Sequence, residues 1–300
     1  MKTIIIRDII KYLDESGIDY SFSGDELTEL AGYSSLHNYK NNTFTWIKNQ
    51  ENLSSECDVN SITLVITSYE VVGVFKNVIR TNESKRAFFS IIEHFYNIDN
   101  GKPGVGRFTY IGPNVRIGNN VRIGNNCTID GEIQIGDNTV IWNNVSIINK
   151  VTIGCNTIIQ SGTVIGHDGF GYTEDENHKK TMIKHYGGVT IGDNVLISSN
   201  VCVVRGTIDD TIIEDGVKID NLSHIAHNCY LGKNSALAFP CFLGGSVKIK
   251  ENGYVAGAII RNQCIIHENG FVGMGAVVTK DVPANTVVVG NPARVFDKIK

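Results

Sequence analysis

The stretch Ile111-Gly-Pro-Asn-Val-Arg-Ile117-Gly-Asn-Asn-Val-Arg-Ile123-Gly-Asn-Asn-Cys-Thr-Ile129 places an isoleucine at every sixth residue. The register continues without a break through Ile135, Ile141, Ile147, Ile153, Ile159 and Ile165. A period of six fits neither an α-helix nor a strand that alternates with period two. It is typical of a parallel β-helix, in which each hexapeptide supplies one short strand and one turn.

Three hexapeptides close one triangular coil, and the aliphatic residue of each points inwards onto its equivalent in the next coil. One coil cannot bury these residues alone, so only a stack of coils is stable. Asparagine suits the left-handed backbone of tight corners, and it recurs at Asn119, Asn120, Asn125 and Asn126. The sequence therefore predicts a mainly β protein built on a left-handed parallel β-helix over residues 107–290.

Residues 1–100 lack this period and predict a small α/β domain in front of the β-helix. The apolar spacing predicts a helix that ends near Gly17, a buried strand over residues 61–67 and a helix over residues 84–96. The glycine-rich segment 101–106 is the expected linker. Residues 291–300 form the expected C-terminal tail.

Composition excludes several classes of function. The net charge is -4 without a long run of Lys or Arg, which argues against nucleic acid as a partner. No apolar stretch reaches membrane-spanning length, and Met1–Ile10 is too short and too polar for a signal peptide, so we expect a cytoplasmic protein. The sequence contains no Cys-x-x-Cys pair, so a structural zinc site is not expected. Four of the seven cysteines stand at inward positions and are expected to be buried and unbridged: Cys127, Cys229, Cys241 and Cys264.

Three segments resemble one known family. They are Val217-Lys-Ile-Asp-Asn-Leu-Ser-His-Ile-Ala-His-Asn228, Gly166-His-Asp-Gly-Phe-Gly-Tyr172 and Arg205-Gly-Thr-Ile-Asp-Asp-Thr-Ile-Ile213. The first resembles the active-site coil of the UDP-3-O-acylglucosamine N-acyltransferase family of lipid A synthesis, and the other two resemble its neighbouring segments. The resemblance implies a homotrimeric acyltransferase with each active site in a groove between subunits.

His227 follows the inward Ile225 by two residues, so its side chain should point outwards. It is either a solvated turn histidine or, as the resemblance implies, a general base that takes the proton of an attacking amine. Asp220 or Asn221 is the expected partner that orients the ring. For His224, a structural role and a substrate-binding role both stay open.

Gly245 lies one coil beyond His227 and leaves room for a thioester. The resemblance implies that its N–H faces the developing oxyanion, whereas the alternative is an ordinary corner glycine. Within the loop that contains the Asp-Gly-Phe-Gly sequence, Asp168, Phe170 and Tyr172 are the expected substrate contacts.

In the front domain, the segment Phe44-Thr-Trp-Ile-Lys-Asn49 resembles the family's nucleotide-binding stretch. Trp46 would stack on a pyrimidine and Asn49 would bind its edge, although Trp46 as a core residue is the alternative. The chain departs from the family at two positions. Asn52 stands where the family has a tyrosine, and Gln263 stands where it has a second histidine.

The C-terminal segments 273–283 and 289–294 resemble the ending of coenzyme A-dependent hexapeptide acyltransferases. Lys280 and Arg294 are therefore expected contacts for the phosphates of the coenzyme, with Gly245 and Gln263 also lining its site. As an alternative, both cations are ordinary surface residues.

The leading prediction is an N-acyltransferase that transfers an acyl group from a thioester to a dTDP- or UDP-linked amino-deoxysugar of a surface glycan. Acyl-CoA is the expected co-substrate, and no permanently bound cofactor or metal is expected. The alternative enzyme is the lipid A N-acyltransferase, which would use acyl carrier protein. A metal-dependent γ-type carbonic anhydrase is less favoured because His224 and His227 lack a third histidine ligand, and a purely structural β-helix would not explain the front domain.

Overall fold

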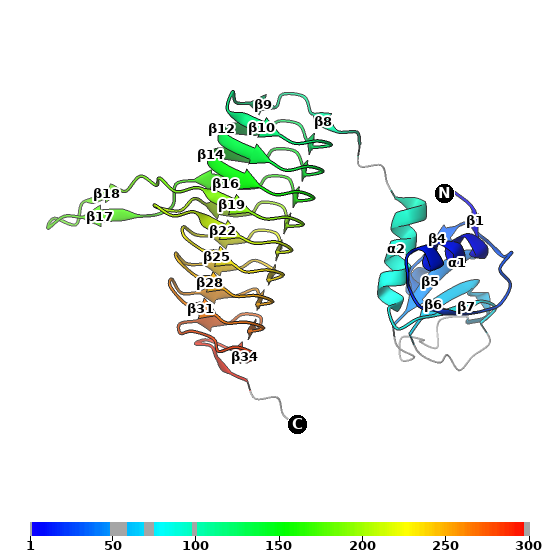
Figure 1. The fold of residues 1–300 in the computed structure, drawn as a ribbon. Helices are drawn as coiled ribbons and strands as arrows, with labels where there is room; N and C mark the ends of the chain where they lie inside the picture. The colour runs from blue at the N-terminus through cyan, green and yellow to red at the C-terminus, as the bar shows by residue number, and fades with distance from the viewer. Residues whose placement is uncertain (1, 49–58, 69–74, 98–100, 297–300) are drawn as a thin grey trace. The chain divides into compact units, whose positions relative to one another are not determined.

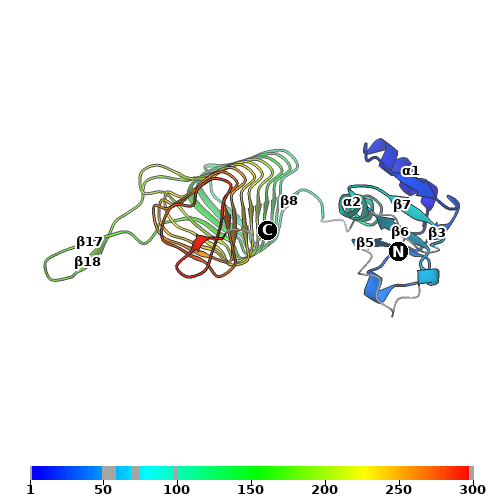
Figure 2. The same ribbon diagram turned by 90° about the horizontal axis from the view of Figure 1, so that it is seen from below.

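The computed structural model describes residues 2–48, 59–68, 75–97 and 101–296. The chain divides into two compact units, Met1–Gly101 and Lys102–Lys300. The first is a small α/β unit and the second is a left-handed parallel β-helix (Figures 1 and 2), as the sequence predicts.

The α/β unit contains a five-stranded sheet in the order β2-β7-β6-β5-β4. Helix α2 (Ser84–Tyr96) packs on this sheet, where Phe88 and Ile91 meet Phe44 and Leu64 in one buried cluster. The other helices among the described residues are α1 (Ile6–Glu15), η1 (Leu36–Asn38) and η3 (Val59–Ser61). The strands are β1 (Ile4–Ile5), β2 (Ser21–Ser23), β3 (Glu29–Leu30), β4 (Gly32–Tyr33), β5 (Thr43–Ile47), β6 (Leu64–Thr67) and β7 (Val78–Arg80).

The β-helix has three faces, which we number in chain order within a coil. The first face contains β9 (Tyr110–Ile111), β12 (Thr128–Ile135), β14 (Ser146–Ile153), β16 (Val164–His167), β21 (Cys202–Val204), β24 (His224–Ile225), β27 (Phe242–Leu243), β30 (Ile259–Ile260) and β33 (Val277–Val278). Strands β12 and β14 continue round the corner onto the second face, which adds β10 (Val115–Ile117), β19 (Val189–Ile191), β22 (Thr211–Ile213), β25 (Tyr230–Leu231), β28 (Lys248–Ile249) and β31 (Ile265–Ile266).

The third face is a separate 11-stranded sheet. Its strands are β8 (Gly104–Val105), β11 (Arg122–Ile123), β13 (Val140–Ile141), β15 (Ile158–Ile159), β20 (Leu196–Ile197), β23 (Lys218–Ile219), β26 (Ala236–Ala238), β29 (Tyr254–Ala256), β32 (Phe271–Val272), β34 (Val287–Val289) and β35 (Arg294–Val295). Parallel pairing stacks the inward residues of each face, as in the ladder Ile129, Ile147 and Ile165. These side chains form one buried cluster along the axis.

Asparagine occupies most corners in the left-handed conformation. Its φ lies between 55° and 58° at Asn120, Asn126, Asn138, Asn144, Asn156, Asn194, Asn200, Asn228, Asn234, Asn252, Asn269 and Asn285. The two adjacent asparagines of one corner have different roles. Asn126 adopts the left-handed conformation of the turn. The side chain of Asn125 accepts a hydrogen bond of 2.7 Å from the backbone N–H of Arg107 in the preceding coil. Corners therefore contribute to coil stacking through side chains as well as backbone.

Both long insertions lie at the corner between the first and second faces, which we call the first corner. The longer insertion separates β16 from β19 and contains a projecting hairpin of β17 (Tyr172–Glu174) and β18 (Lys180–Met182), seen at the left of Figure 1. The shorter insertion separates β21 from β22. An insertion at a corner leaves the inward ladders in register, because Ile165 still pairs with Val203.

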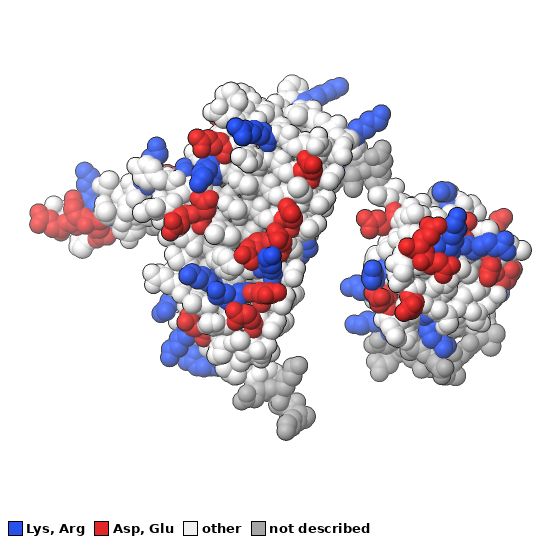
Figure 3. Space-filling model, in the orientation of Figure 1, with Lys and Arg blue, Asp and Glu red and all other residues white. Residues whose placement is uncertain are grey.

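The distribution of surface charge and the burial of the cysteines match what the sequence predicts. In Figure 3, Lys and Arg side chains are interspersed with Asp and Glu over the visible surface. Cys127, Cys229, Cys241 and Cys264 are buried and free. Among the described residues, no helix is long and apolar enough to cross a membrane.

Two glycines with similar backbone angles give a matched test of coil stacking. Gly131 has φ 134°, and an added Cβ would lie 2.0 Å from the carbonyl oxygen of Asn149 in the next coil. Gly104 has φ 140°, and an added Cβ would meet nothing within 4 Å. We expect Gly104→Ala to cost roughly 1–2 kcal/mol of backbone strain, and Gly131→Ala to cost about 1–3 kcal/mol more through the collision. Thermal unfolding followed by circular dichroism should rank the two variants in this order, and equal melting temperatures would contradict the stacking argument.

Candidate active site

The first corner brings several predicted residues together in successive coils. Gly245 lies in the coil after His227, and Gln263 lies in the coil after that. Backbone hydrogen bonds join these turns, because Ser246 N–H donates to the carbonyl of His227 and Gln263 N–H donates to that of Gly245, both at 2.9 Å. His227 and Gly245 are half-buried, whereas Gln263 is exposed.

The imidazole of His227 lies between two glycines. A Cβ on Gly245 would lie 2.6 Å from Cε1 and 2.7 Å from Nε2 of His227, and a Cβ on Gly169 would lie 3.3 Å from its Cδ2. A side chain at Gly245 would therefore displace the ring. The glycine at this corner serves to admit the ring, in addition to any room it leaves for a ligand.

Hydrogen bonds of Asn228 fix the tautomer of His227. The side-chain N–H₂ of Asn228 donates to the carbonyl of Asp209 at 3.0 Å, which leaves its Oδ1 facing His227. This Oδ1 lies 3.1 Å from Nδ1 of His227 and also accepts the hydroxyl of Thr207 at 2.8 Å. An amide oxygen only accepts hydrogen bonds, so Nδ1 of His227 carries the proton and Nε2 keeps its lone pair. Nε2, on the side towards Gly245, is thus able to act as a base.

The expected orienting role of Asp220 or Asn221 is not what the hydrogen bonds show. Asp220 accepts the backbone N–H groups of Phe239 and Asn221, which hold the pKa of its carboxyl below the usual value. Asn221 accepts the N–H of Ser199. Both residues follow β23 and lie at the corner between the third and first faces, one side of the triangle away from His227. Asn228, which immediately follows His227 in the sequence, orients its ring instead.

The backbone N–H of Gly245 donates none of the hydrogen bonds found among the described residues. Its two neighbours both donate to adjacent coils: the N–H of Gly244 to the carbonyl of Ile260 and the N–H of Ser246 to the carbonyl of His227. A free donor next to a base is the arrangement that an oxyanion site requires.

His224 lies on the first face, in β24, and its ring stacks on Phe242 with centroids 5.1 Å apart. Burial lowers the pKa of His224. This ring is therefore held neutral by its apolar surroundings, which favours packing or substrate contact over proton transfer.

The Asp-Gly-Phe-Gly loop approaches His227 within the same chain, at Gly169. Asp168 is 3.7 Å from the buried guanidinium of Arg205, so it braces the loop. Phe170 and Tyr172 are exposed and contact each other edge to face at 5.6 Å. Arg205 lies in one of the segments that carried the resemblance, but no sequence pattern marks it as the partner of Asp168.

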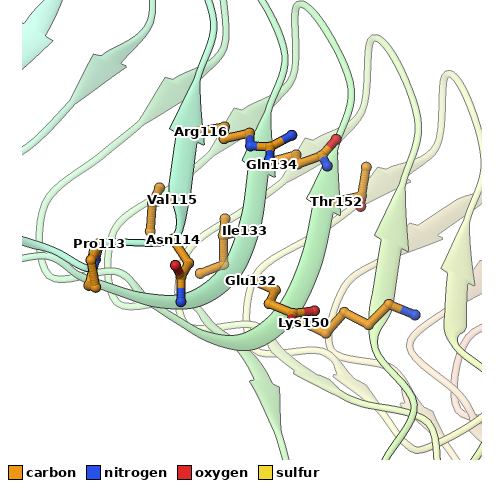
Figure 4. A pocket seen from close by; sticks show the side chains of 9 residues that line it. All are labelled: Pro113, Asn114, Val115, Arg116, Glu132, Ile133, Gln134, Lys150 and Thr152. Carbon is orange, nitrogen blue, oxygen red and sulfur yellow. The ribbon is translucent and has the colours of Figure 1, made fainter.

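Two grooves lie along the β-helix. One, of about 750 Å³, adjoins the first corner and is lined by Asn228, Ser246, Lys248 and Lys250 together with acidic Asp209 and Asp210. Another, of about 480 Å³, lies over the first coils, where Arg116, Gln134 and Thr152 project from neighbouring strands (Figure 4). None of its lining residues is a predicted site residue, and its Lys150 pairs with Asp210 at 3.3 Å.

In the α/β unit, Trp46 is partly packed into the core and also lines a groove. Its indole N–H donates to Ser84 at 3.0 Å, and its ring packs near Phe88 and Phe89. The half-buried ring also lines a groove of about 670 Å³ with Lys48, Arg86 and Phe89. Asn49 and Asn52 lie outside the described residues.

The predicted phosphate contacts Lys280 and Arg294 are exposed near the C-terminal end of the β-helix. Lys280 follows β33 at the first corner, and Arg294 begins β35. Coils are spaced by about 4.8 Å, so Lys280 lies roughly 14 Å along the axis from His227. Within the described parts of the chain, no group of three or more His, Cys, Asp or Glu side chains is placed to hold a metal ion.

Cysteine is an unsuitable nucleophile near this corner. Burial raises the pKa of Cys229, which follows Asn228, to about 12. Cys202, beside His224 on the first face, also has its pKa raised by burial. Because the thiolate is the reactive form, neither thiol is suited to attack a substrate.

Comparison with known proteins bears on the fold and on the family resemblance. The family described as bacterial transferase hexapeptide (six repeats) matches residues 103–131 and 132–167. UDP-3-O-acylglucosamine N-acyltransferase of Delftia acidovorans is 41% identical over 131 residues, which cover 43% of this chain and 39% of that protein. The corresponding protein of Saccharophagus degradans is 58% identical over 78 residues, or 26% of this chain and 23% of its own.

Among solved structures, LpxA from Acinetobacter baumannii is similar with a TM-score of 0.58 and 28% identity, covering 64% of this chain and 74% of that one. The aligned part of this chain spans about two-fifths of the length of the Delftia relative. These matches confirm the hexapeptide-repeat fold and the resemblance to UDP-3-O-acylglucosamine N-acyltransferases.

The Asn228 contact predicts how the titration of His227 responds to substitution. Asn228→Asp places a negative charge beside the protonated Nδ1. This variant should raise the titration midpoint of His227 by about one pH unit or more. Replacement by Ala removes the acceptor and should lower the midpoint. NMR titration of the histidine rings measures both shifts, and an unchanged midpoint in both variants would show that Asn228 does not orient the base.

Proposed function

We propose that this chain is an N-acyltransferase that moves an acyl group from a thioester to the amine of a nucleotide-linked amino sugar. The observation that carries the proposal is the first corner, where the unprotonated Nε2 of His227 and the free N–H of Gly245 lie together. The similarity to proteins named UDP-3-O-acylglucosamine N-acyltransferase supports the same reaction class.

In the proposed reaction, the amine of the sugar attacks the thioester carbonyl while Nε2 of His227 takes one of its protons. The N–H of Gly245 donates to the oxyanion that forms. The carbon–sulfur bond then breaks as the amide forms, and the proton on His227 passes to the departing thiolate. No covalent intermediate on the protein is needed, in agreement with the raised pKa of Cys229.

For the acceptor, the names of the relatives favour UDP-3-O-acylglucosamine over the amino-deoxysugar that the sequence put first. We therefore place the lipid A substrate, with acyl carrier protein as donor, as the leading candidate. The groove beside Asn228 suits the diphosphate of either candidate, because Lys248 and Lys250 supply cations for phosphate oxygens.

A dTDP- or UDP-linked amino-deoxysugar with acyl-CoA as donor stays as the second candidate. The observation in its favour is the pair of exposed cations Lys280 and Arg294 near the last coil, in segments that resemble coenzyme A users. Gln263, at the position of the family's second histidine, also separates this chain from the lipid A enzymes.

The α/β unit is proposed to bind the pyrimidine of the nucleotide. Trp46 supplies one aromatic face to a groove that Lys48 and Arg86 also line, so a base and a phosphate both find complementary groups there. A homotrimer in the cytoplasm, with the groove at the first corner closed by a second subunit, completes the proposal.

Mass spectrometry of products tests the reaction. UDP-3-O-acylglucosamine and a panel of dTDP- and UDP-linked amino-deoxysugars should each be offered with acyl carrier protein thioesters and with acyl-CoA. An amide product with either donor supports N-acyl transfer, and its identity decides between the two candidates. The absence of any amide from a preparation that light scattering shows to be trimeric would overturn the proposed reaction.

His227→Ala should reduce the rate of the chemical step by roughly 10²- to 10⁴-fold, the usual contribution of a positioned general base. Binding of the sugar nucleotide should change little. His224→Ala is the matched control, and a milder loss is expected because His224 packs on Phe242. Near-normal kcat in the His227 variant would remove it as the base.

Trp46→Ala should weaken nucleotide binding and leave kcat at saturation almost unchanged. Stacking on an aromatic ring contributes ~1–3 kcal/mol per base, so Kd should rise roughly 5- to 150-fold. Calorimetry measures the affinity, and circular dichroism checks that loss of the Ser84 contact has not unfolded the unit. A folded variant with unaltered affinity would make Trp46 a packing residue only.

A further inference from the structure

His185 has an unusual hydrogen-bonding state that the proposed mechanism leaves unexplained. Its side chain is fully buried, with 0% exposure. Nδ1 lies 3.1 Å from the carbonyl oxygen of Ile183, and because a carbonyl only accepts, Nδ1 carries the proton. Nε2 then has a free lone pair, and it finds no hydrogen-bond partner among the described residues.

The ring of His185 lies against the ring of His227. Their centroids are 5.5 Å apart and their planes cross at 80°. A Cβ added to Gly169 would lie 3.0 Å from Nε2 of His185 and 3.3 Å from Cδ2 of His227. The bare nitrogen of one ring and the C–H edge of the other therefore line the same small space, which exists because residue 169 has no side chain.

Other contacts hold His185 in this place. Its backbone N–H is 3.4 Å from the carboxylate of Asp168, which pairs with Arg205 at 3.7 Å. Arg205 also donates through Nε to the carbonyl of Gly187 at 2.6 Å. Besides His227, the ionisable side chains that the described contacts place around His185 are Asp168, from the insertion itself, and Arg205, from the neighbouring coil. They neutralise each other.

A buried acceptor without a donor destabilises the folded protein, so it calls for an explanation. A substrate does not reach this nitrogen, because the residue has no exposed surface. The neighbour that changes charge during the proposed reaction is His227. On taking a proton it becomes an imidazolium, whose positive charge extends to its ring C–H groups.

We propose that His185 is a positioning residue for His227, whose protonated form it stabilises by directing the lone pair of Nε2 towards the Cδ2–H edge of that ring. The inference rests on the proposed function in assigning His227 as the base, but the contact between the rings does not. The 167–188 insertion therefore does more than form a projecting hairpin: the irregular segment between β18 and β19 supports the ring of His227.

NMR titration of the ring protons of the full-length protein tests the contact without any substrate. His185→Phe keeps an aromatic ring and removes the lone pair, and it should lower the titration midpoint of His227 by about half a pH unit, the size expected of a weak C–H contact. His185→Gln retains a side-chain acceptor and should restore part of the shift. His178→Phe, at an exposed histidine of the same insertion, should leave the midpoint unchanged.

A midpoint of His227 that is the same in the unmodified protein and in both His185 variants would overturn the proposal. If His185→Phe does not fold, the unmodified protein still decides: nitrogen chemical shifts must show Nδ1 of His185 protonated and Nε2 bare, and the opposite tautomer would overturn it. In the enzyme assay, the acid limb of the kcat/KM profile should shift in parallel with the midpoint. Failure to find any acyl transfer would remove the proposed function and leave the titration result standing.

Discussion

The structure depends on the stacking of inward aliphatic side chains in register along three faces. Each coil buries Ile129 or its equivalents only against the coils above and below, so the ladder must stay continuous. This constraint fixes where the chain is free to vary. Strands admit only the six-residue pattern, whereas corners accept added residues, because a detour there returns the chain to the same ladder. Both long insertions lie at one corner, and so does the candidate active site.

The constraint also explains why a rigid stack is a suitable platform for proton transfer. Neighbouring coils are about 4.8 Å apart, which is close enough for one coil to shape the side chain of the next. His227 fits because Gly245 in the following coil has no Cβ, and because Gly169 leaves space on the other edge of the ring. The position of the base is thus set by backbone on two sides and by Asn228 at Nδ1.

The fold could be predicted from the sequence because a strict period leaves one solution, and the helix over residues 84–96 followed from its apolar spacing. The residues that contact the ring of His227 could not be predicted from the sequence. Asp220 and Asn221 look close to it in sequence, but six residues of this repeat carry the chain to a different corner. Asn228 was part of the quoted motif, and only its hydrogen bonds reveal its role. His185 follows an insertion that interrupts the period, so no pattern indicates that it returns to the base.

The hydrogen-bond acceptor at Nδ1 of His227 is a neutral amide, and its lack of charge affects how strongly the ring holds a proton. A carboxylate at Nδ1 would favour the imidazolium and leave less of the free base near neutral pH. The amide of Asn228 fixes the same tautomer without that penalty, because its Oδ1 also accepts the Thr207 hydroxyl and its N–H₂ donates to Asp209. The uncharged His185 supports the ring in the same manner from the opposite edge. Both contacts are weak while His227 is neutral and strengthen when it takes a proton, so they act on the state in which positive charge develops. In the proposed reaction, a corner built from amides, a second neutral imidazole and glycines would keep His227 unprotonated before proton transfer and stabilise its imidazolium afterwards.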